Sequence, residues 1–457
     1  MIREMFSVGI SGLHAASLGT TVTSQNLSNL DTPGYSRQMP VQHPLALEAG
    51  GGVITGSPVR VVDDMVERRL TEATTLAGEA SARADSVSVL DQVFSEMEGS
   101  IGSALRRFEE ALAGFAQAPS ERSPRTLLLA AAEQVTTAFN AAGQAVDDAR
   151  ADANSAIVRE VQHVNARLEE IAGLNVRVAD ALGSGQEAGS LLDHRDMLIR
   201  EVGERMPVSV VEHDSGAVTL MLDGSRILVG PGGEHRELTT GVNGDGNRYV
   251  IARNGSVEED VTSFIDSGKV FGYMDARDGS LADVEALVDE LAYDTVNAYN
   301  SVHQAGYGLD GSTGRNLFIP LAQIPGAAVQ MELSSDVAGQ PDNVAGAQAV
   351  GLAGDNRNAL ALQEVAENPV ASGLSRTLGE AYASLVGVAG TAVESANYAS
   401  NHATSALEQT QSMRDSLSGV SSDEELVNLV KYQRAYQASM RVVQTADSLL
   451  EELLNMR

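Results

Sequence analysis

Apolar residues recur at intervals of three and four at both ends of the chain, as they do along one face of an α-helix. Near the N-terminus this stripe contains Phe6, Ile10, Leu13 and Leu27, with polar residues at the positions between the last two. The last helix carries a longer stripe of the same spacing, formed by Leu426, Leu429, Tyr436, Met440, Val443, Leu450 and Leu454. The two stripes predict that the N- and C-terminal helices pair as a coiled coil through these residues.

Similar seven-residue patterns predict long helices inside the chain. The longest patterns cover residues 66–94, 123–182 and 378–417, and shorter helices are expected at 101–115, 190–205 and 281–303. A helix of roughly 35–45 residues extends about 50–65 Å. A compact chain of this length would have a radius of gyration of only about 22 Å. The pattern therefore predicts an elongated rod.

The period changes to that of β-strands in the middle of the chain. Short β-branched or apolar runs at 208–212, 217–222 and 226–229 are separated by Asp-Ser-Gly and Asp-Gly-Ser turns, which indicates hairpins. Residues 306–356 are rich in loop-forming residues. The predicted fold is mainly α with a smaller β-rich portion (α+β), in which the terminal helices are paired.

The charge of the chain narrows the classes of partner. It has 457 residues with 31 Lys+Arg and 62 Asp+Glu, a formal net charge of −31. Sequence-independent binding to nucleic acid or to anionic lipid depends on clustered Lys and Arg. We therefore expect neither nucleic acid nor a membrane as a partner. Cysteine is absent, which excludes disulfides, thiolate metal sites and cysteine nucleophiles.

No targeting or membrane segment is visible in the sequence. Residues 1–18 contain Glu4 and His14 and lack the continuous apolar stretch of a cleaved signal peptide. The most apolar candidate for a membrane helix, residues 381–393, is too short to span a bilayer. If the chain is secreted, we expect its export to proceed without a cleaved signal peptide.

Candidate catalytic and metal-binding motifs are incomplete. His194-Arg195-Asp196 matches the start of a kinase catalytic loop, but Glu201 occupies the position that requires a metal-binding Asn. Residues 310–314 resemble part of a calcium loop without its bidentate acid. A surface helix and a plain turn explain these two strings better. The sequence therefore predicts no catalytic, cofactor-binding or metal-binding residues, and no enzyme.

A string near the N-terminus is more specific. It contains Asn26, Asn29, Thr32, Pro33, Gly34, Tyr35 and Arg37. This string resembles the N-terminal signature of the flagellar rod, hook and hook-associated axial proteins, and residues 428–439 resemble their C-terminal signature. Two internal segments, 191–196 and 354–362, are similar to those of the hook-associated members. Four motifs in the family's order make the resemblance strong.

The resemblance implies a structural subunit of the bacterial flagellum. It would be exported by the flagellar type III apparatus and would join hook to filament at the hook–filament junction, where filament assembly and motility require it. The implied partners are further copies in a homo-oligomeric ring, the hook protein on one side and a second hook-associated junction protein on the filament side. A cytoplasmic export chaperone is expected to bind the C-terminal region. The two terminal stripes would then form the assembly surface.

The resemblance also suggests a division into domains. Residues 1–62 and 419–457 are expected to form a terminal coiled-coil inner core domain. Residues 63–206 and 264–418 would form a helical stalk domain, with a β-hairpin region at 207–263. Family members commonly carry an outer β-rich domain late in the chain. Here only the loop-rich segment 306–356 occupies that place, so we expect the outer domain to be missing or vestigial.

Other functions remain open at this point. The nearest alternative is another axial flagellar subunit of the hook or rod type, which segments 191–196 and 354–362 disfavour. A coiled-coil surface adhesin would use the strands at 207–263 as its binding module. A hydrolase is the enzyme alternative, since a β-rich segment could contain a pair of acids.

Overall fold

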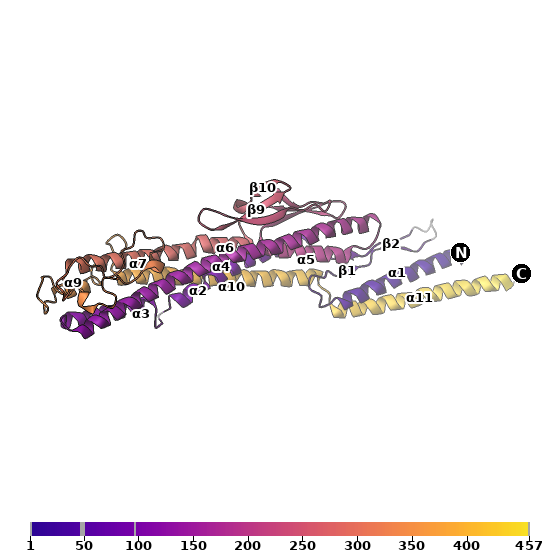
Figure 1. The fold of residues 1–457 in the computed structure, drawn as a ribbon. Helices are drawn as coiled ribbons and strands as arrows, with labels where there is room; N and C mark the ends of the chain where they lie inside the picture. The colour runs from indigo at the N-terminus through magenta and orange to yellow at the C-terminus, as the bar shows by residue number, and fades with distance from the viewer. Residues whose placement is uncertain (1, 46–50, 96, 456–457) are drawn as a thin grey trace. The chain divides into compact units, whose positions relative to one another are not determined.

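The computed structural model describes residues 2–45, 51–95 and 97–455, and these are mostly helical (Figure 1). The α-helices of eight or more residues are α1 (Ile2–Ser28), α2 (Asp64–Val93), α3 (Ile101–Gln117), α4 (Arg122–Gly183), α5 (Gly189–Arg205), α6 (Gly268–Asp278), α7 (Ser280–Ala305), α9 (Arg357–Glu364), α10 (Leu378–Ser418) and α11 (Ser422–Asn455). Short helical turns are α8 (Ala327–Gln330), η2 (Thr262–Phe264) and η3 (Pro341–Asn343). The long helices predicted from the heptad patterns are confirmed, whereas α6 and α9 were not expected.

The strands form small antiparallel sheets. They are β1 (Gln38–Met39), β2 (Gln42–Pro44), β3 (Val53–Thr55), β4 (Val59–Arg60), β5 (Val208–Glu212), β6 (Val218–Leu222), β7 (Arg226–Val229), β8 (Glu237–Val242), β9 (Arg248–Asn254) and β10 (Val257–Asp260). The pairs are β1–β4 and β2–β3, and the larger sheets have the orders β5-β6-β7 and β8-β9-β10. The predicted α+β class is confirmed.

Local sequence explains the hairpin between β6 and β7. Asp223 and Gly224 connect β6 to β7, and both have left-handed backbone angles, with φ of 47° and 62°. Two such residues in succession match the twist of the flanking strands, and Asp-Gly is a preferred pair for this turn. Segment 36–62 contains the two short strand pairs β1–β4 and β2–β3.

The chain forms two compact units. Unit 1 contains residues 1–79, 158–271 and 402–457, and unit 2 contains 80–157 and 272–401. Helices α2, α4, α6 and α10 therefore contribute residues to both. These two units do not correspond to the terminal, stalk and outer domains that the sequence suggested, and that division stays a prediction.

Unit 1 attaches its sheets to α4 through two asparagine side chains. Asn175 is fully buried, donates to the carbonyls of Val218 and Gly230, and accepts from the Val218 N–H at 3.0 Å. Asn165 makes the equivalent pair of bonds with Leu238, at 2.6 and 2.7 Å. An amide side chain offers both a donor and an acceptor, so it can replace a neighbouring strand at a sheet edge. These bonds fix both three-stranded sheets on one helix.

The core of unit 2 depends on a few aromatic side chains. Phe108, Phe115, Phe139 and Phe318 are fully buried. The ring of Phe108 meets that of Tyr299 edge-on, with centroids 4.9 Å apart. Each buried aromatic ring removes a large apolar area from water, which compensates for the low aromatic content of the chain. These residues bring α3, α4 and α7 together with the loop segment.

Segment 306–356 is loop-rich as predicted, and polar side chains on the surrounding helices satisfy its backbone. Asn300 accepts from the N–H groups of Leu317 and Phe318 at 2.9 Å, and Asp289 accepts from those of Gly326 and Ala328. Buried backbone groups require such partners when no regular strand or helix supplies them. The loop is therefore part of the core rather than a surface appendage.

Arg125 is the largest fully buried side chain in this group. It donates to the carbonyls of Pro119, Pro341 and Val344, at 2.6, 3.2 and 2.6 Å. Burial lowers its pKa to about 10. Within segment 354–362, Asn356 donates to the carbonyl of Ala116 and Asn358 donates to that of Ala345. This motif thus anchors the loop segment and does no chemistry.

His303 carries the clearest pH dependence in unit 2. Its Nδ1–H donates to the carbonyl of Arg315 at 2.8 Å, and its Nε2 accepts from the Ala345 N–H at 3.0 Å. A proton on Nε2 would face another donor. Burial lowers the pKa of His303, so the folded chain keeps it neutral.

We therefore expect His303 to reduce the free energy of unfolding as the pH falls below about 6.5, the pKa of a histidine in the unfolded chain. The unfolded chain binds a proton there that the folded chain does not. His303→Gln keeps one donor and one acceptor without titrating. Urea unfolding at pH 7.5 and pH 5.5 should show a larger loss of stability for the unaltered chain than for His303→Gln. Equal losses would contradict this role.

Candidate assembly surface

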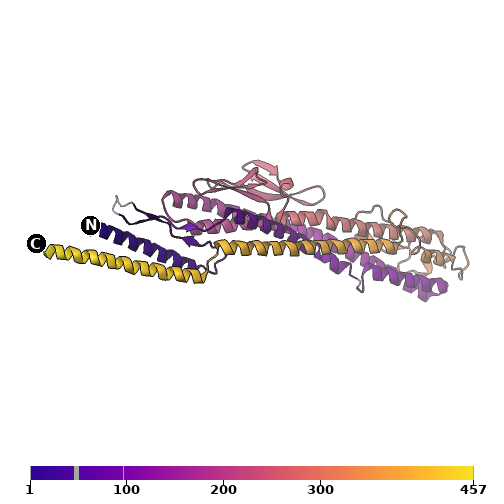
Figure 2. The same cartoon turned by 180° about the vertical axis from the view of Figure 1, so that it is seen from behind.

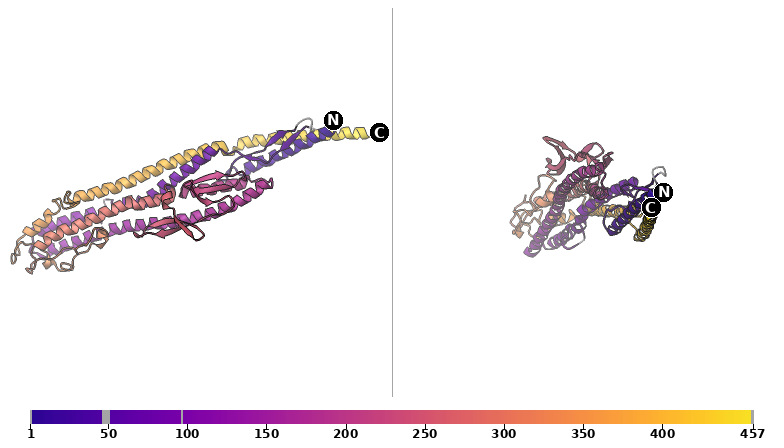
Figure 3. Two further views of the ribbon diagram at one scale, coloured as in Figure 1. Left: turned by 90° about the horizontal axis from the view of Figure 1, so that it is seen from above. Right: turned by 90° about the vertical axis from the view of Figure 1, so that its right-hand side faces the viewer.

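Helices α1 and α11 lie side by side and run antiparallel (Figures 2 and 3). Glycines of α1 determine how closely they approach. A Cβ added at Gly9 would lie 2.7 Å from Val443 Cγ2, and one at Gly19 would lie 2.4 Å from the ring of Tyr432. Atoms other than hydrogen cannot pack so closely, so only glycine fits at these two positions. Near the end of α1, Asn26 meets Glu425.

The predicted pairing of the terminal helices is confirmed, but the face of α1 that makes it was predicted wrongly. The residues of α1 that become buried are mostly small: Gly9, Ala15, Ala16, Gly19, Val22, Thr23 and Asn26. Ile10 is 47% exposed, and Phe6, Leu13 and Leu27 are only half-buried. Apolar spacing identified the stripe of large residues correctly. Spacing alone did not show that the small residues of α1 allow the two helices to approach closely. Because of this close approach, the large residues of α1 lie beside the contact and not in it.

The stripe of α11 shows the same displacement. Its buried or half-buried residues toward α1 include Glu425, Tyr432, Ser439 and Ala446, which are seven residues apart. Some of the predicted assembly residues come one position after a contact residue, and the others lie between two contact residues or beyond the last of them. Leu426, Tyr436, Met440, Leu450 and Leu454 are exposed, while Leu429 and Val443 are half-buried.

Both stripes lie on one side of the helix pair. On α1 the stripe follows the contact by one position, as Leu13 follows Gly12. On α11 it does the same, as Leu426 follows Glu425 and Met440 follows Ser439. In an antiparallel pair, the same displacement along both chains points to the same side. The other predicted residues therefore lie on one side of the pair, while Val443 faces Gly9 in the contact itself. This side is called here the terminal apolar face: Phe6, Ile10, Leu13, Leu27, Leu426, Leu429, Tyr436, Met440, Leu450 and Leu454.

Most of α1 carries no charged residue, and the two terminal segments together are close to neutral. Between Glu4 and Asp31 there is no Asp, Glu, Lys or Arg. Residues 1–62 and 419–457 together contain seven Lys+Arg and nine Asp+Glu, a net charge of −2, whereas the whole chain carries −31. A solvated helix normally carries charged residues on its outer face. A charge-free outer face is typical of a surface that another protein covers.

Helix α11 also extends beyond its partner. Continuing the antiparallel register of Gly9 with Val443 and Gly19 with Tyr432 places Ile2 opposite residue 449 or 450. Figure 1 shows α11 continuing past the start of α1. Leu453 and Leu454 in this extension are 56% and 67% exposed. The last turn of α11 thus has apolar side chains with no cover from α1.

The β2–β3 pair covers another side of α1. The Val53 N–H donates to Ser11 Oγ at 3.2 Å, and the Gln42 side chain donates to the carbonyl of Ala15. A Cβ at Gly52, whose φ is +118°, would lie 2.4 Å from Ser11 Oγ. This side of α1 is therefore closed to a further partner.

The signature residues form a hydrogen-bonded cluster where α1 ends. Asn26 is 1% exposed and accepts from the Tyr35 hydroxyl at 2.8 Å and from the Gln38 N–H at 2.9 Å. Its amide donates to the carbonyl of Gln38 and to Glu425 Oε2, at 2.9 and 3.1 Å. All the bonding capacity of this side chain is used. Burial, with the nearby charges of Asp193 and Glu425, raises the pKa of Tyr35 to about 12 and keeps its hydroxyl a donor.

Glu425 connects this cluster to the start of α11. Its side chain is 2% exposed, and Arg37 donates to its Oε1 at 2.8–2.9 Å. Arg37 also reaches the exposed Glu424 at 2.8 Å, and its backbone N–H donates to the carbonyl of Ser418. Charge-assisted bonds of this kind are stronger than neutral ones. The signature cluster therefore holds both terminal helices to the connection between α10 and α11.

The turn between α1 and Arg37 depends on Pro33 and Gly34. Proline cannot continue the helix, and Gly34 has a φ of +80°, which disfavours other residues. Arg414 of α10 donates to the carbonyl of Gly34 and to Ser36 Oγ, at 3.0 and 3.1 Å. Asn29 and Thr32 bond to each other at 3.2 Å inside the turn. The predicted signature residues other than Pro33 thus each make a hydrogen bond, and Pro33 ends the helix.

Segment 191–196 supports the same region. Asp193 accepts from the Ser36 N–H and pairs with Arg60 at 2.9 Å, and Asp196 pairs with the same arginine at 2.6 Å. Burial raises the pKa of Asp193, which Arg60 opposes. Arg195 is buried and donates to the carbonyl of Gly216. The string that resembles a kinase loop is therefore a structural bracket in unit 1.

The rest of the described chain adds no site of another kind. Among residues 2–45, 51–95 and 97–455, no group of three or more His, Cys, Asp or Glu could hold a metal ion. Asp310, in the string resembling a calcium loop, pairs with Arg315, and that hydrogen bond lowers the pKa of Asp310 to about 2. No helix in the described ranges combines the length and the apolar content that crossing a bilayer requires.

A mainly helical chain whose two ends pair, with the signature turn where they meet, is the architecture of an axial structural protein of the bacterial flagellum. The profile described as "Flagellar hook-associated protein FlgK helical domain" matches residues 87–318. The chain belongs to this family of flagellar hook-associated proteins, which are structural proteins and not enzymes. Residues 413–456 also match the C-terminal region of the flagellar basal body rod FlgEFG proteins.

Relatives from distant bacteria agree with this assignment. The chain is 24% identical to flagellar hook-associated protein 1 of Salmonella typhimurium over 556 residues, covering all of both chains. It is also 24% identical to the Bacillus subtilis protein of that name, covering 97% of this chain and 96% of the relative. The solved structure of the flagellar hook junction protein FlgK from Burkholderia pseudomallei has the same fold. Its TM-score is 0.65 at 16% identity, over 76% of this chain and 100% of that one.

The close approach of α1 and α11 predicts the effect of a single methyl group. Gly19→Ala should destabilise the helix pair by about 1–3 kcal/mol, because the added Cβ overlaps the ring of Tyr432. The matched control is Gly173→Ala in α4, where nothing lies within 4 Å of an added Cβ. There the better helix propensity of alanine should stabilise the chain by about 0.5–1 kcal/mol. Hydrogen exchange of α1 amides measures the first effect, and thermal unfolding measures the second. A stabilising Gly19→Ala would mean that the helices are farther apart.

Removal of the buried carboxylate tests the signature cluster. Glu425→Ala leaves Arg37 and Asn26 without their partner, so it should cost about 2–4 kcal/mol. Glu424→Ala removes an exposed partner of the same arginine and should cost less than about 1 kcal/mol. Urea unfolding followed by circular dichroism compares the two variants. Equal effects would show that burial of Glu425 does not matter.

Proposed function

We propose that this chain is the subunit that joins the hook to the flagellar filament. It assembles as a homo-oligomeric ring at the hook–filament junction, and filament assembly and motility require it. Membership of the hook-associated family supports this location, as does the likeness to a protein described as a hook junction protein. The terminal helix pair is the part of the subunit that makes the ring.

The terminal apolar face is the observation that carries this proposal. It combines exposed leucines and a methionine on α11 with Ile10 and the half-buried Phe6 and Leu13 on α1. Burying one such side chain contributes about 1.5–3 kcal/mol, and each subunit of a ring repeats the contact. A face of this size with no charged residue on α1 is costly in water unless neighbouring copies cover it.

The distribution of charge supports the same arrangement. The terminal segments have a net charge of −2, so copies can pack closely there without repulsion. Almost all the remaining negative charge lies in residues 63–418. Like charges repel, so the acidic parts of neighbouring subunits favour contact with solvent. Assembly through the ends satisfies both conditions.

The neighbours along the axis follow from the position in the flagellum. The hook protein lies on one side of the ring, and a second hook-associated junction protein lies on the filament side. Before assembly the chain is exported through the flagellar type III apparatus as a secreted protein, without cleavage of a signal peptide. A cytoplasmic chaperone holds its C-terminal region. The apolar extension of α11, with Leu450, Leu453 and Leu454, is the surface that such a chaperone would cover.

The domain division is part of the proposal. Residues 1–62 and 419–457 are the inner core domain, 63–206 and 264–418 the stalk, and 207–263 its β-hairpin region. The match to the Salmonella relative runs over 556 residues, more than the 457 of this chain. This excess supports the absence or reduction of an outer domain, whose place segment 306–356 occupies.

A hook or rod subunit is the second candidate, since residues 413–456 match the basal body rod proteins. Residues 413–456 contain the end of α10 and α11, so this match concerns the C-terminal helices alone. The match of residues 87–318 is to the hook-associated helical domain. The junction is therefore the preferred location over the hook or rod.

A charge on the terminal apolar face tests the proposal. Leu450→Asp should leave the melting temperature of the free subunit nearly unchanged, because this side chain is 41% exposed there. It should abolish filament attachment and motility, because an unpaired carboxylate would be buried between copies. Leu450→Met is the matched control and should stay motile.

The measurements are a circular dichroism melt, a blot for secreted protein and immunogold labelling of flagella. The unaltered chain should label the hook–filament boundary. Normal filaments on a secreted Leu450→Asp variant would remove this face from the proposal. Label along the hook or rod would favour the second candidate, and diffuse surface label would favour a surface adhesin.

A further inference from the structure

A short loop between α9 and α10 in unit 2 holds an unusual backbone. Ala371 is buried, and its N–H and carbonyl pair with the carbonyl and N–H of Arg376 at 2.9 and 3.2 Å. The Ser372 N–H donates to Asp294 Oδ2 of α7 at 2.9 Å, and Ser375 Oγ donates to the carbonyl of Ser372. The loop is therefore fixed at its base on α7.

The tip of this loop presents a strained apolar side chain. Ser372, Gly373 and Leu374 have φ values of 50°, 68° and 64°. Only glycine adopts such angles without cost, and a bulky residue there persists only where its surroundings impose it. Leu374 is nevertheless 72% exposed. Its side chain is therefore open to contact from outside the subunit.

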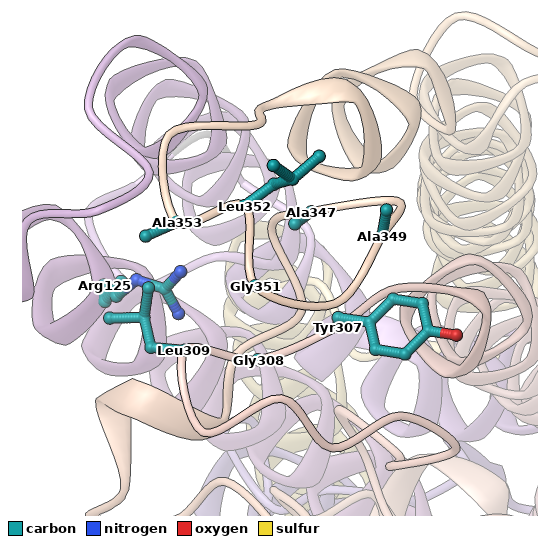
Figure 4. A pocket seen from close by; sticks show the side chains of 9 residues that line it. All are labelled: Arg125, Tyr307, Gly308, Leu309, Ala347, Ala349, Gly351, Leu352 and Ala353. Carbon is teal, nitrogen blue, oxygen red and sulfur yellow. The ribbon is translucent and has the colours of Figure 1, made fainter.

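A recess of matching size lies elsewhere in unit 2. Its volume is about 130 Å³, and its walls come from Arg125 of α4 and from loops 307–309 and 347–353 (Figure 4). The exposed lining of the recess is more polar than apolar, and the Arg125 guanidinium is part of it; its apolar side chains include Leu309, Ala349 and Leu352. An apolar cavity of about 150 Å³ accommodates a benzene ring. The recess therefore has room for the side chain of one leucine.

We propose that Leu374 of one subunit inserts into this recess of a second copy of the chain. A projection and a recess at different places on one molecule make a heterologous contact, and repetition of such a contact closes a ring when the rotation allows it. The contact lies in unit 2 and is separate from the terminal apolar face. It adds to the proposed ring a second surface between copies.

Charge complementarity supports a second copy as the occupant. Arg376 is exposed two residues from Leu374, and Asp342 is exposed beside the recess, one residue from Pro341, whose carbonyl binds Arg125. Arg376 forms no ion pair with another residue in the described ranges, whereas the charge of Asp342 acts on the buried Arg125 and opposes the lowering of its pKa by burial. Docking Leu374 brings the Arg376 guanidinium of one copy toward the Asp342 carboxylate of the next. The strained leucine and the exposed Arg376 then have one common explanation.

The absence of cysteine from the sequence makes cross-linking a specific test. The full-length double variant Leu374→Cys, Ala349→Cys should form intermolecular disulfides in oxidised, isolated flagella and give a ladder of oligomers on non-reducing gels. Each single variant should remain monomeric. The control pair Tyr398→Cys, Ala349→Cys has an equally exposed cysteine away from the loop and should give no ladder.

A ladder from the control pair, or none from the test pair on motile cells with normal filaments, would overturn this contact. The two proposals can fail separately. A missing ladder on motile cells would exclude the Leu374 contact but not the ring, and normal filaments on the Leu450→Asp variant would exclude the terminal apolar face but not the cross-link.

Two further variants separate a contact from a structural role. Leu374→Gly relieves the backbone angle, so the free subunit should keep its melting temperature while filaments detach more readily under shear. Exchange of charge tests the ion pair. Arg376→Asp and Asp342→Arg should each weaken filament retention, and the double variant should restore it. A double variant no better than the singles would overturn the pairing, as would a lower melting temperature for Leu374→Gly.

Discussion

The close antiparallel approach of α1 and α11 determines the chemistry of both ends of the subunit. The α1 side of the contact is made of Gly9, Gly19 and alanines, and Tyr432 and Val443 of α11 pack against the two glycines. This leaves no room in the contact for a leucine or phenylalanine of α1. The large apolar residues are therefore displaced to one side of the pair, where they form the terminal apolar face. A helix pair with leucines in its contact would bury its large apolar side chains within the pair and would expose no apolar face. Here glycine in the contact keeps a face open for assembly.

Fixed polar contacts keep this helix pair in register. Asn26, Arg37 and Glu425 satisfy one another at the point where α1 ends and α11 begins. Because buried amide and charged groups lose more than they gain when a partner is missing, the cluster tolerates one arrangement only. A face made of two helices requires such precision, since a slip along either helix would break up the apolar surface. The signature cluster thus aligns the two helices that form the terminal apolar face.

In unit 2, polar side chains likewise fix the position of a loop. Segment 306–356 has little regular structure, yet Arg125, Asn300 and His303 supply the partners that its backbone needs. These side chains come from helices that would otherwise present polar residues to the core. The loop can therefore lie inside the unit and shape a small recess.

The sequence by itself determined the α+β class, the long helices, the hairpins around Asp223 and Gly224, the flagellar family and the residues of both apolar stripes. These depend on spacing and local turn chemistry, which a linear string contains. It did not determine that Phe6 and Leu13 turn away from α11, nor that Asn26 and Glu425 meet across the whole length of the chain. Spacing marks the most apolar face of a helix, but the partner decides which face it contacts, and small residues win where close backbone approach is possible. Only the tertiary structure contains that partner, and therefore only it could place the apolar stripes on the outside of the pair.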